Sequence, residues 1–245
     1  MNNEKTLKGN PNKFTINQHI HTVQSISKFT NDNGSVDFCF KDSKKHFFVK
    51  PENQLFCGKR VWSEKSEKGF IKTIEDNFHS ELNLILKNGI ISNNMAISEY
   101  FLLWRIKYSL KEANTDDVKL NIISAENHSK EDEEYYEKNH LYFIQSDGSM
   151  PSRFLNDINV IQLFDMNHQY IDNLQWGIIS STTGEFIVAD CYLNYMFFPI
   201  SPKISLGVNY HNSKINHQEL RRLNNLSINE SQIYYFARNL HYCPY

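Results

Sequence analysis

The sequence feature that most constrains the fold is a pair of amphipathic segments in residues 69–111. In the first segment, apolar residues recur about one helical turn apart, at Phe70, Ile74, Phe78, Leu82 and Ile85. Asn88-Gly89 supplies helix-ending chemistry, and a second helix is predicted from about Asn94 to Lys111. Two consecutive helices that each carry an apolar face can bury those faces against each other. We therefore predict an antiparallel helix pair.

Strand patterns lie on the N-terminal side of this pair. A turn at residues 31–34 precedes Val36–Phe40, which alternates as a strand does, and His46–Val49 completes a predicted hairpin. Before the hairpin, apolar residues recur every third position in Gln18–Phe29. That spacing predicts a short helix, or an irregular turn followed by one.

On the C-terminal side, a helical segment is predicted around Phe154–Ile171. Two apolar strands follow it, Gln175–Ser180 and Phe186–Ala189, and the Gly-containing residues 181–185 between them predict a hairpin turn. Residues 197–208 add one or two further strands, with prolines that mark an edge or a bend.

The last predicted element is a helix near the C-terminus. Ser227 and Glu230 fit a capping box, with Ser227 as N-cap and Glu230 three residues later. Apolar residues continue to Leu240, so the helix is expected to run that far. We expect it to close the fold.

Together these elements predict one α+β domain over residues 14–245. Its mainly antiparallel sheet packs against the antiparallel helix pair and against the C-terminal helix. A hydrophobic fraction of 40% and an aromatic fraction of 13% are sufficient for a packed core. Residues 1–13 are polar and include the breaker cluster Gly9-Asn10-Pro11-Asn12, so we expect a disordered or flexible arm there.

Charge and hydropathy narrow the range of partners. A net charge of -2 argues against binding of long nucleic acid or of an anionic membrane over an extended surface. Binding of nucleic acid in a local groove, or of a small nucleotide, stays possible. There is no apolar run of about 18 residues and no signal-peptide pattern at Met1, so we expect a cytoplasmic protein with no membrane association. A protein partner and the oligomeric state stay open.

The cysteines and histidines give few signals of a metal site. The four cysteines lack a Cys-x-x-Cys spacing and are expected to be reduced and mostly buried. His19-Ile20-His21 would place two imidazoles on one face if it were extended, as in many metal sites, whereas in a helix the two rings would point apart. The phosphate-binding, zinc-protease and serine-hydrolase motifs are all absent.

Asp190 is the strongest single candidate for a functional residue. It follows the apolar strand Phe186–Ala189, and a carboxylate in that position is costly to desolvate unless it is paired, hydrogen-bonded or in use.

The segment Gln18–Phe29 resembles the opening of a bacterial domain-of-unknown-function family whose members begin with Gln-His-Tyr-Val-Pro, followed by Leu-x-x-Phe. His19 falls on the histidine of that family, Ile26 on its leucine and Phe29 on its phenylalanine. The chain departs from the pattern at Ile20-His21-Thr22, where the family has Tyr-Val-Pro.

The resemblance extends through most of the chain. Ile74-Glu75 is similar to the family's Ile-Glu helix, Trp104-Arg105 to its arginine-bearing helix, and residues 186–190 to its Phe-Ile-Thr-Ser-Asp-Asn-Pro strand. Residues 198–203 resemble its Phe-Pro-Leu-Ser-Pro segment, and Asn229 with Ala237-Arg238 resembles its final helix. Here Cys191-Tyr192 follows Asp190, in place of the family's Asn-Pro.

Two functional hypotheses follow for His19, Glu75, Arg105 and Asp190. In the first, the protein hydrolyses phosphodiesters, as a nuclease or nucleotide phosphodiesterase of a bacterial defence or mobile-element system. His19 would then act as general acid or base, Glu75 and Asp190 would orient it or hold a divalent metal, and Arg105 would stabilise an anionic transition state. In the second, the protein is a non-catalytic module that binds a ligand or another protein. Arg105 then bridges Glu75 and Asp190 in a structural ion-pair network that His19 caps.

Overall fold

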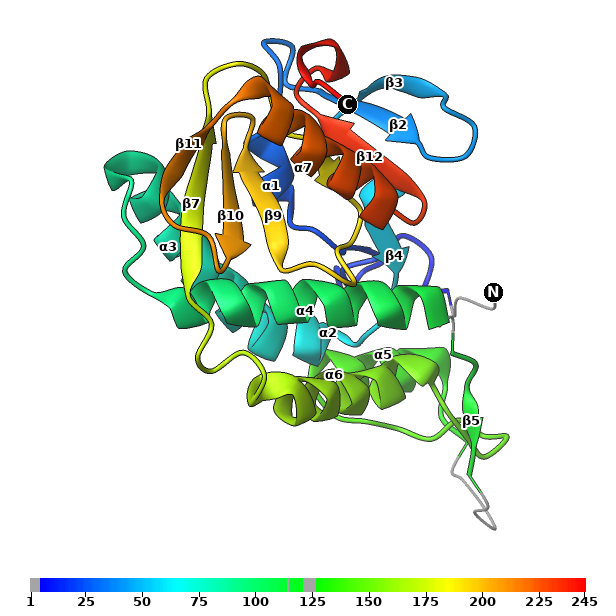
Figure 1. Cartoon of the computed structure of the whole chain (residues 1–245). Coiled ribbons are helices and arrows are strands. Elements are labelled where there is room, and N and C mark those ends of the chain that lie inside the picture. The colour runs from blue at the N-terminus through cyan, green and yellow to red at the C-terminus, as the bar shows by residue number, and fades with distance from the viewer. Residues whose placement is uncertain (1–4, 114, 121–126) are drawn as a thin grey trace.

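The predicted helix pair forms the middle of the molecule. The structure, a computed structural model, describes residues 5–113, 115–120 and 127–245 (Figure 1). Helix α3 (Lys72–Asn88) ends at Gly89, whose φ of 67° is left-handed and whose N–H bonds to the Ile85 carbonyl, and α4 (Asn94–Ala113) follows after a short turn. Most of α4 is buried, because it packs on α3, on α6 (Ser152–His168) and under the sheets.

Two four-stranded sheets lie on the same side of α4 (Figure 1). One has the strand order β11-β7-β10-β9 and the other β3-β2-β12-β8, and every pairing in them is antiparallel except that of β11 with β7. The strands of the first sheet are β7 (Trp176–Ser181), β9 (Phe197–Ser201), β10 (Ile204–Val208) and β11 (Ser213–Ile215). Those of the second are β2 (Val36–Phe40), β3 (His46–Val49), β8 (Val188–Ala189) and β12 (Tyr234–Ala237).

The remaining elements are short apart from α7. They are β1 (Asn17–His19), α1 (Val23–Ser27), the 3-10 turn η1 (Gln54–Phe56), β4 (Cys57–Lys59), α2 (Glu64–Ser66), the π-helical turn η2 (Glu67–Ile71), β5 (Val118–Lys119), α5 (Lys130–Lys138), β6 (Ser149–Met150), α7 (His217–Glu230) and the 3-10 turn η3 (Leu240–Tyr242). β1 pairs with β4, and β5 pairs with β6. With 41% helix and 19% strand among the described residues, the structure is the predicted single-domain α+β fold.

The predicted hairpin of residues 175–189 is wrong. β7 pairs with β10 and β11, whereas β8 pairs with β12 in the other sheet. The intervening chain crosses between the sheets, and buried Asn224 of α7 satisfies part of its backbone there: the Asn224 side chain accepts from Ile187 N and donates to the Glu185 carbonyl. An apolar run of four residues did not reveal which sheet it joins.

The predicted C-terminal helix also lies in the wrong place. α7 begins after the N-cap Asn216, whose side chain accepts from Glu219 N, and Ser227 lies in its last turn. Residues 234–237, predicted as helix, form β12 between β2 and β8. Both faces of Tyr234–Ala237 are buried, and the aromatic residues there favour a strand.

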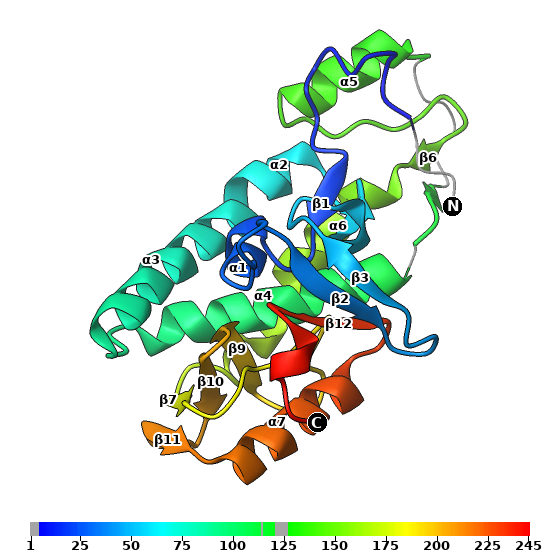
Figure 2. The ribbon, with the colours of Figure 1, turned by 90° about the horizontal axis from the view of Figure 1, so that it is seen from above.

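The N-terminal segment is bonded to α5 over its described part, residues 5–13. The Leu7 N–H and the Asn12 side chain donate to the buried carboxylate of Glu134, and Lys138 donates to the Asn12 carbonyl. α5 starts at a capping box of Ser129 and Asp132, and its first turn is acidic. It lies at one end of the molecule, away from both four-stranded sheets (Figure 1 and Figure 2). Residues 1–4 of the predicted arm lie outside the described residues.

The core is aromatic and centred on α4. Trp104, Phe101 and Tyr100 of α4 are almost fully buried against rings from the sheets and α3, among them Phe198 and Phe78. The four cysteines are free and buried, as predicted. In the described part of the chain, no helix has the length and apolar character needed to cross a membrane.

Candidate functional site

His19 and Glu75 lie in the same electrostatic neighbourhood. His19 ends β1, is half-buried, and its Nε2 lies 3.1 Å from the Pro51 carbonyl oxygen. Burial lowers the pKa of His19, and the positive charge of Lys107 lowers it further, while Glu75 opposes both effects. Glu75 forms an ion pair of 2.6 Å with the buried Lys107 of α4. The cation that pairs with Glu75 is thus Lys107, and not Arg105. The Lys107 ammonium also lies 5.4 Å from the Trp62 ring centre.

Arg105 contacts a different part of the protein. It lies two residues before Lys107 on α4, and side chains at that spacing diverge around a helix. Its guanidinium donates to the Leu193 carbonyl and lies 5.7 Å from the Phe101 ring centre. The predicted bridge from Arg105 to Glu75 and Asp190 is therefore wrong in its geometry.

Asp190 holds the chain between α7 and β12. Its carboxylate accepts three backbone hydrogen bonds, from Gln232 N at 2.8 Å, Ile233 N at 2.7 Å and Tyr234 N at 3.2 Å. Burial raises the pKa of Asp190, and these three donors oppose the rise. Its main-chain carbonyl accepts from Trp104 Nε1 at 3.1 Å. The contacts of Asp190 are those of a structural carboxylate, and the catalytic roles of all four residues stay predictions.

Two other histidines are more deeply buried than His19. His21 stacks on Trp104 with ring centres 4.3 Å apart, and its Nδ1 lies 2.9 Å from the Tyr100 hydroxyl. His79 Nε2 lies 2.9 Å from the Thr22 hydroxyl. Burial holds the pKa of His21 well below its usual value and lowers that of His79 to about 4. Among the described residues, no three His, Cys, Asp or Glu side chains are grouped so that they could hold a metal ion.

These histidines predict a loss of stability in acid. The pKa of His79 is about 4 in the folded state and near 6.5 when exposed, so the unfolded chain binds more protons between these values. Stability is then fully present above pH ~6.5, and up to about 3 kcal/mol is lost as the pH falls to ~4. Urea unfolding at several pH values measures this loss. His79→Gln should reduce it, whereas His211→Gln, at an exposed position, should leave it unchanged.

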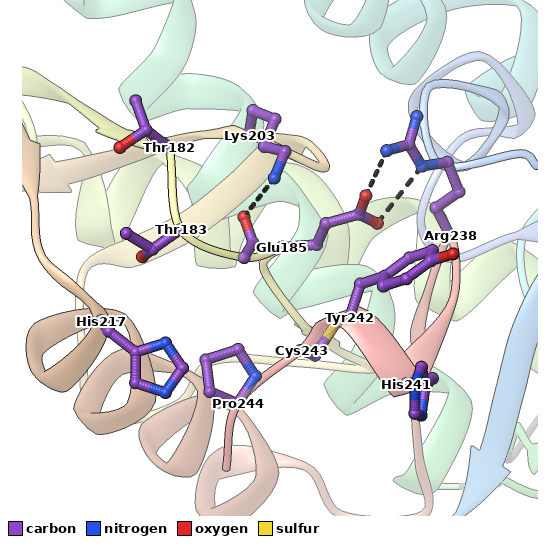
Figure 3. Close-up of a pocket in the computed structure, with 11 residues that line it drawn as sticks. Thr182, Thr183, Glu185, Lys203, His217, Arg238, His241, Tyr242, Cys243 and Pro244 are labelled. Atoms are coloured by element: carbon purple, nitrogen blue, oxygen red, sulfur yellow. Dashed lines mark hydrogen bonds and ion pairs between the residues drawn. The ribbon is translucent and has the colours of Figure 1, made fainter.

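A pocket of about 530 Å³ is formed by segments that connect strands and helices (Figure 3). The sequence patterns do not predict it. Four separate stretches of chain line it. They contribute Thr182, Thr183 and Glu185 from the β7–β8 connection, Lys203 from the β9–β10 turn, His217 from the start of α7, and Arg238, His241 and Tyr242 from the segment after β12. We call it the cationic pocket.

The polar contacts in the cationic pocket fix its floor. The Arg238 guanidinium binds both carboxylate oxygens of buried Glu185, and this hydrogen bonding raises the pKa of Arg238. Lys203 Nζ donates to the Gly184 carbonyl at 2.8 Å, and Figure 3 shows its amine directed at this stretch of chain. Gly184 permits the close packing here, because a Cβ on it would lie 2.8 Å from Leu220 and 2.9 Å from Pro244.

Sequence patterns do not bring these residues together, because they predict a hairpin turn at residues 181–185 and a helix that includes Arg238. No protein-family model, curated protein or solved structure matches this chain.

Proposed function

We propose that this protein binds a small phosphate-bearing molecule, such as a nucleotide, in the cationic pocket. The observation that carries the proposal is the charge of the lining: Lys203 and Arg238 are cations, and Glu185 is the one acidic residue among the lining residues. Because Glu185 is already neutralised by Arg238, the remaining positive charge is that of Lys203. Phosphate oxygens accept strong hydrogen bonds from an ammonium group and from hydroxyls such as those of Thr182 and Thr183.

The size of the pocket and the charge of the chain favour a small ligand. A volume of about 530 Å³ falls within the range of small-molecule sites. A chain with a net charge of -2 offers little attraction to long nucleic acid, whose binding depends on many neutralised phosphates. This supports a free nucleotide or a similar phosphate ester as the ligand.

Removing the Lys203 charge is the direct test. We expect wild-type protein to bind pyrophosphate or adenosine monophosphate in a calorimetric titration, and Lys203→Gln to bind about tenfold more weakly, as expected for one charge-assisted hydrogen bond. Lys203 is exposed, so the substitution should cost the fold little beyond the hydrogen bond to the Gly184 carbonyl. Lys214→Gln, an exposed lysine on β11, is the matched control. Equal affinities of the two variants, or no binding by wild type, would reject the proposal.

Phosphodiester hydrolysis is the second candidate function, and the two histidines of the pocket favour it. His217 and His241 both line the pocket, and a pair of imidazoles can serve as general base and general acid toward one phosphodiester. Their site differs from that of His19 and Glu75, which was predicted from the sequence.

Hydrolysis of bis(p-nitrophenyl) phosphate distinguishes the two sites. Loss of activity in His217→Asn and His241→Asn, with His19→Asn still active, places the reaction in the cationic pocket. The reverse result places it at His19, as the sequence predicted. His211→Asn, which changes an exposed histidine outside the pocket, controls for the loss of an imidazole. Absence of turnover in the wild type leaves the protein as a binding module.

A further inference from the structure

Cys39, His46 and Asp37 share the outer face of the β3-β2-β12-β8 sheet. Asp37 and Cys39 are two residues apart on β2, so their side chains lie on the same face. Cys39 faces His46 directly across the antiparallel pair of β2 with β3. Facing residues have their Cβ atoms about 5 Å apart, so the thiol and the imidazole are neighbours on this face. Cys39 Sγ donates to the Phe40 carbonyl at 3.5 Å, so the side chain must rotate from this acceptor toward His46 before a proton can pass between them.

The carboxylate of Asp37 fixes the orientation of His46. Asp37 is 4% exposed, and its Oδ1 lies 3.2 Å from His46 Nδ1, while its Oδ2 accepts from the backbone N–H of Leu240 at 3.0 Å. A carboxylate at Nδ1 favours the tautomer that carries its proton there, which leaves Nε2 free to accept a proton. Such an arrangement of nucleophile, base and orienting group is typical of thiol-dependent acyl transfer.

These three residues line a cavity of about 700 Å³ that is separate from the cationic pocket. The other residues around it include the apolar or aromatic Phe48, Ile228, Tyr235, Leu240 and Tyr245 and the polar Asn225, Asn239 and His241. Lys44 also lines the cavity, with its ammonium 5.9 Å from the Tyr235 ring centre. The cavity therefore offers an apolar surface for an acyl chain, next to a cation that suits a developing oxyanion.

We propose that Cys39, His46 and Asp37 form a site that accepts an apolar acyl group from an activated ester. The Cys39 sulfur attacks the carbonyl carbon as His46 Nε2 takes the thiol proton. The carbon–oxygen bond to the leaving alcohol then breaks, and His46 returns the proton to that oxygen. The product is a thioester on Cys39, and attack by water releases the carboxylic acid and regenerates the thiol.

The chain contains an internal comparison. Cys57 of β4 faces His19 of β1 in the same antiparallel manner, but His19 bonds to a main-chain carbonyl and not to a carboxylate. Burial raises the pKa of Cys57 to about 11, which disfavours its thiolate. Cys57 is thus a matched control for a thiol beside an imidazole that lacks an orienting carboxylate.

The test uses p-nitrophenyl butyrate as the probe. We expect a burst of p-nitrophenol and a butyryl group mapped to Cys39 by peptide mass spectrometry. His46→Gln, at a side chain that is 63% exposed and therefore tolerant of change, should slow acylation about 100-fold. Cys57→Ser should acylate at the wild-type rate. An adduct confined to other residues, or equal rates in wild type and His46→Gln, would overturn the proposal.

Asp37 is a positioning residue, so its test needs a readout that a purely structural role would not move. Asp37→Asn, an amide of the same shape, should slow acylation of Cys39, and Asp37→Glu should restore part of the rate because it restores the carboxylate. Melting temperatures identify any variant that fails to fold. If Asp37→Asn and Asp37→Glu acylate at the same rate while both are folded, the carboxylate has no role in orienting His46.

Discussion

Replacing Asp190 with alanine should lower the free energy of unfolding by about 4 kcal/mol, because three backbone N–H groups lose their acceptor in a buried site. Asp190→Asn should cost less, about 2 kcal/mol, since the amide retains one oxygen acceptor but places an NH₂ group against the remaining donors. Urea unfolding monitored by circular dichroism measures both values.

The control for Asp190 is Asp165→Asn on α6, where the carboxylate is exposed and a change within about 0.5 kcal/mol is expected. The same variants separate the two roles considered for Asp190. A folded Asp190→Asn protein of wild-type stability that has lost ligand turnover would contradict the structural role and support the catalytic prediction.

The second large effect is expected at Glu137 of α5. Its carboxylate lies 2.6 Å from Arg60 and 2.9 Å from Arg153, and all three side chains are less than 10% exposed. Glu137→Ala leaves two buried guanidinium groups without the carboxylate that they share. We expect this to cost on the order of 3 to 5 kcal/mol in urea unfolding, as removing one member of a buried ion pair does.

Two variants test the cause of the Glu137 effect. Glu131→Ala, at an exposed position of the same helix, should change the stability by less than about 0.5 kcal/mol. Glu137→Gln keeps the volume but removes the charge, so it should be nearly as destabilising as Glu137→Ala if electrostatics dominates. A small effect of Glu137→Gln beside a large effect of Glu137→Ala would instead attribute the loss to packing.

The elements predicted well are those with a regular apolar period over many residues. Ile74, Phe78, Leu82 and Ile85 recur along one face of α3, so this helix and its Gly89 cap follow from local chemistry. Phe70, predicted in the same helix, lies before it in η2. The β2–β3 hairpin is equally local, because a turn and two short strands are consecutive. The misplaced elements depend on distant partners. β8 joins its sheet through β12. Ser227, predicted to start a helix, lies in the last turn of α7, where its hydroxyl bonds to that of Tyr192.

The same reason explains what was missed at the candidate site. The ion-pair hypothesis gives Glu75 a cation from α4, and Glu75 does pair with one, but that cation is Lys107 and not Arg105. Arg105 and Lys107 are two positions apart on α4, so their side chains lie on different sides of the helix. The sequence does not show which of these sides faces α3. The cationic pocket combines residues 182–185, 203, 217 and 238–244, so no local pattern could have predicted it.

The turn η3 gives the two proposed sites a common wall. His241 lines both the cationic pocket and the cavity beside Cys39. The backbone of η3 bonds to each side: Tyr242 O accepts from Glu185 N at 2.9 Å, and Leu240 N donates to Asp37. A ligand that shifts this turn from one side changes the free energy of binding on the other, and such coupling is reciprocal. Pyrophosphate should therefore alter the acylation rate of Cys39, and acylated protein should bind pyrophosphate with a changed affinity.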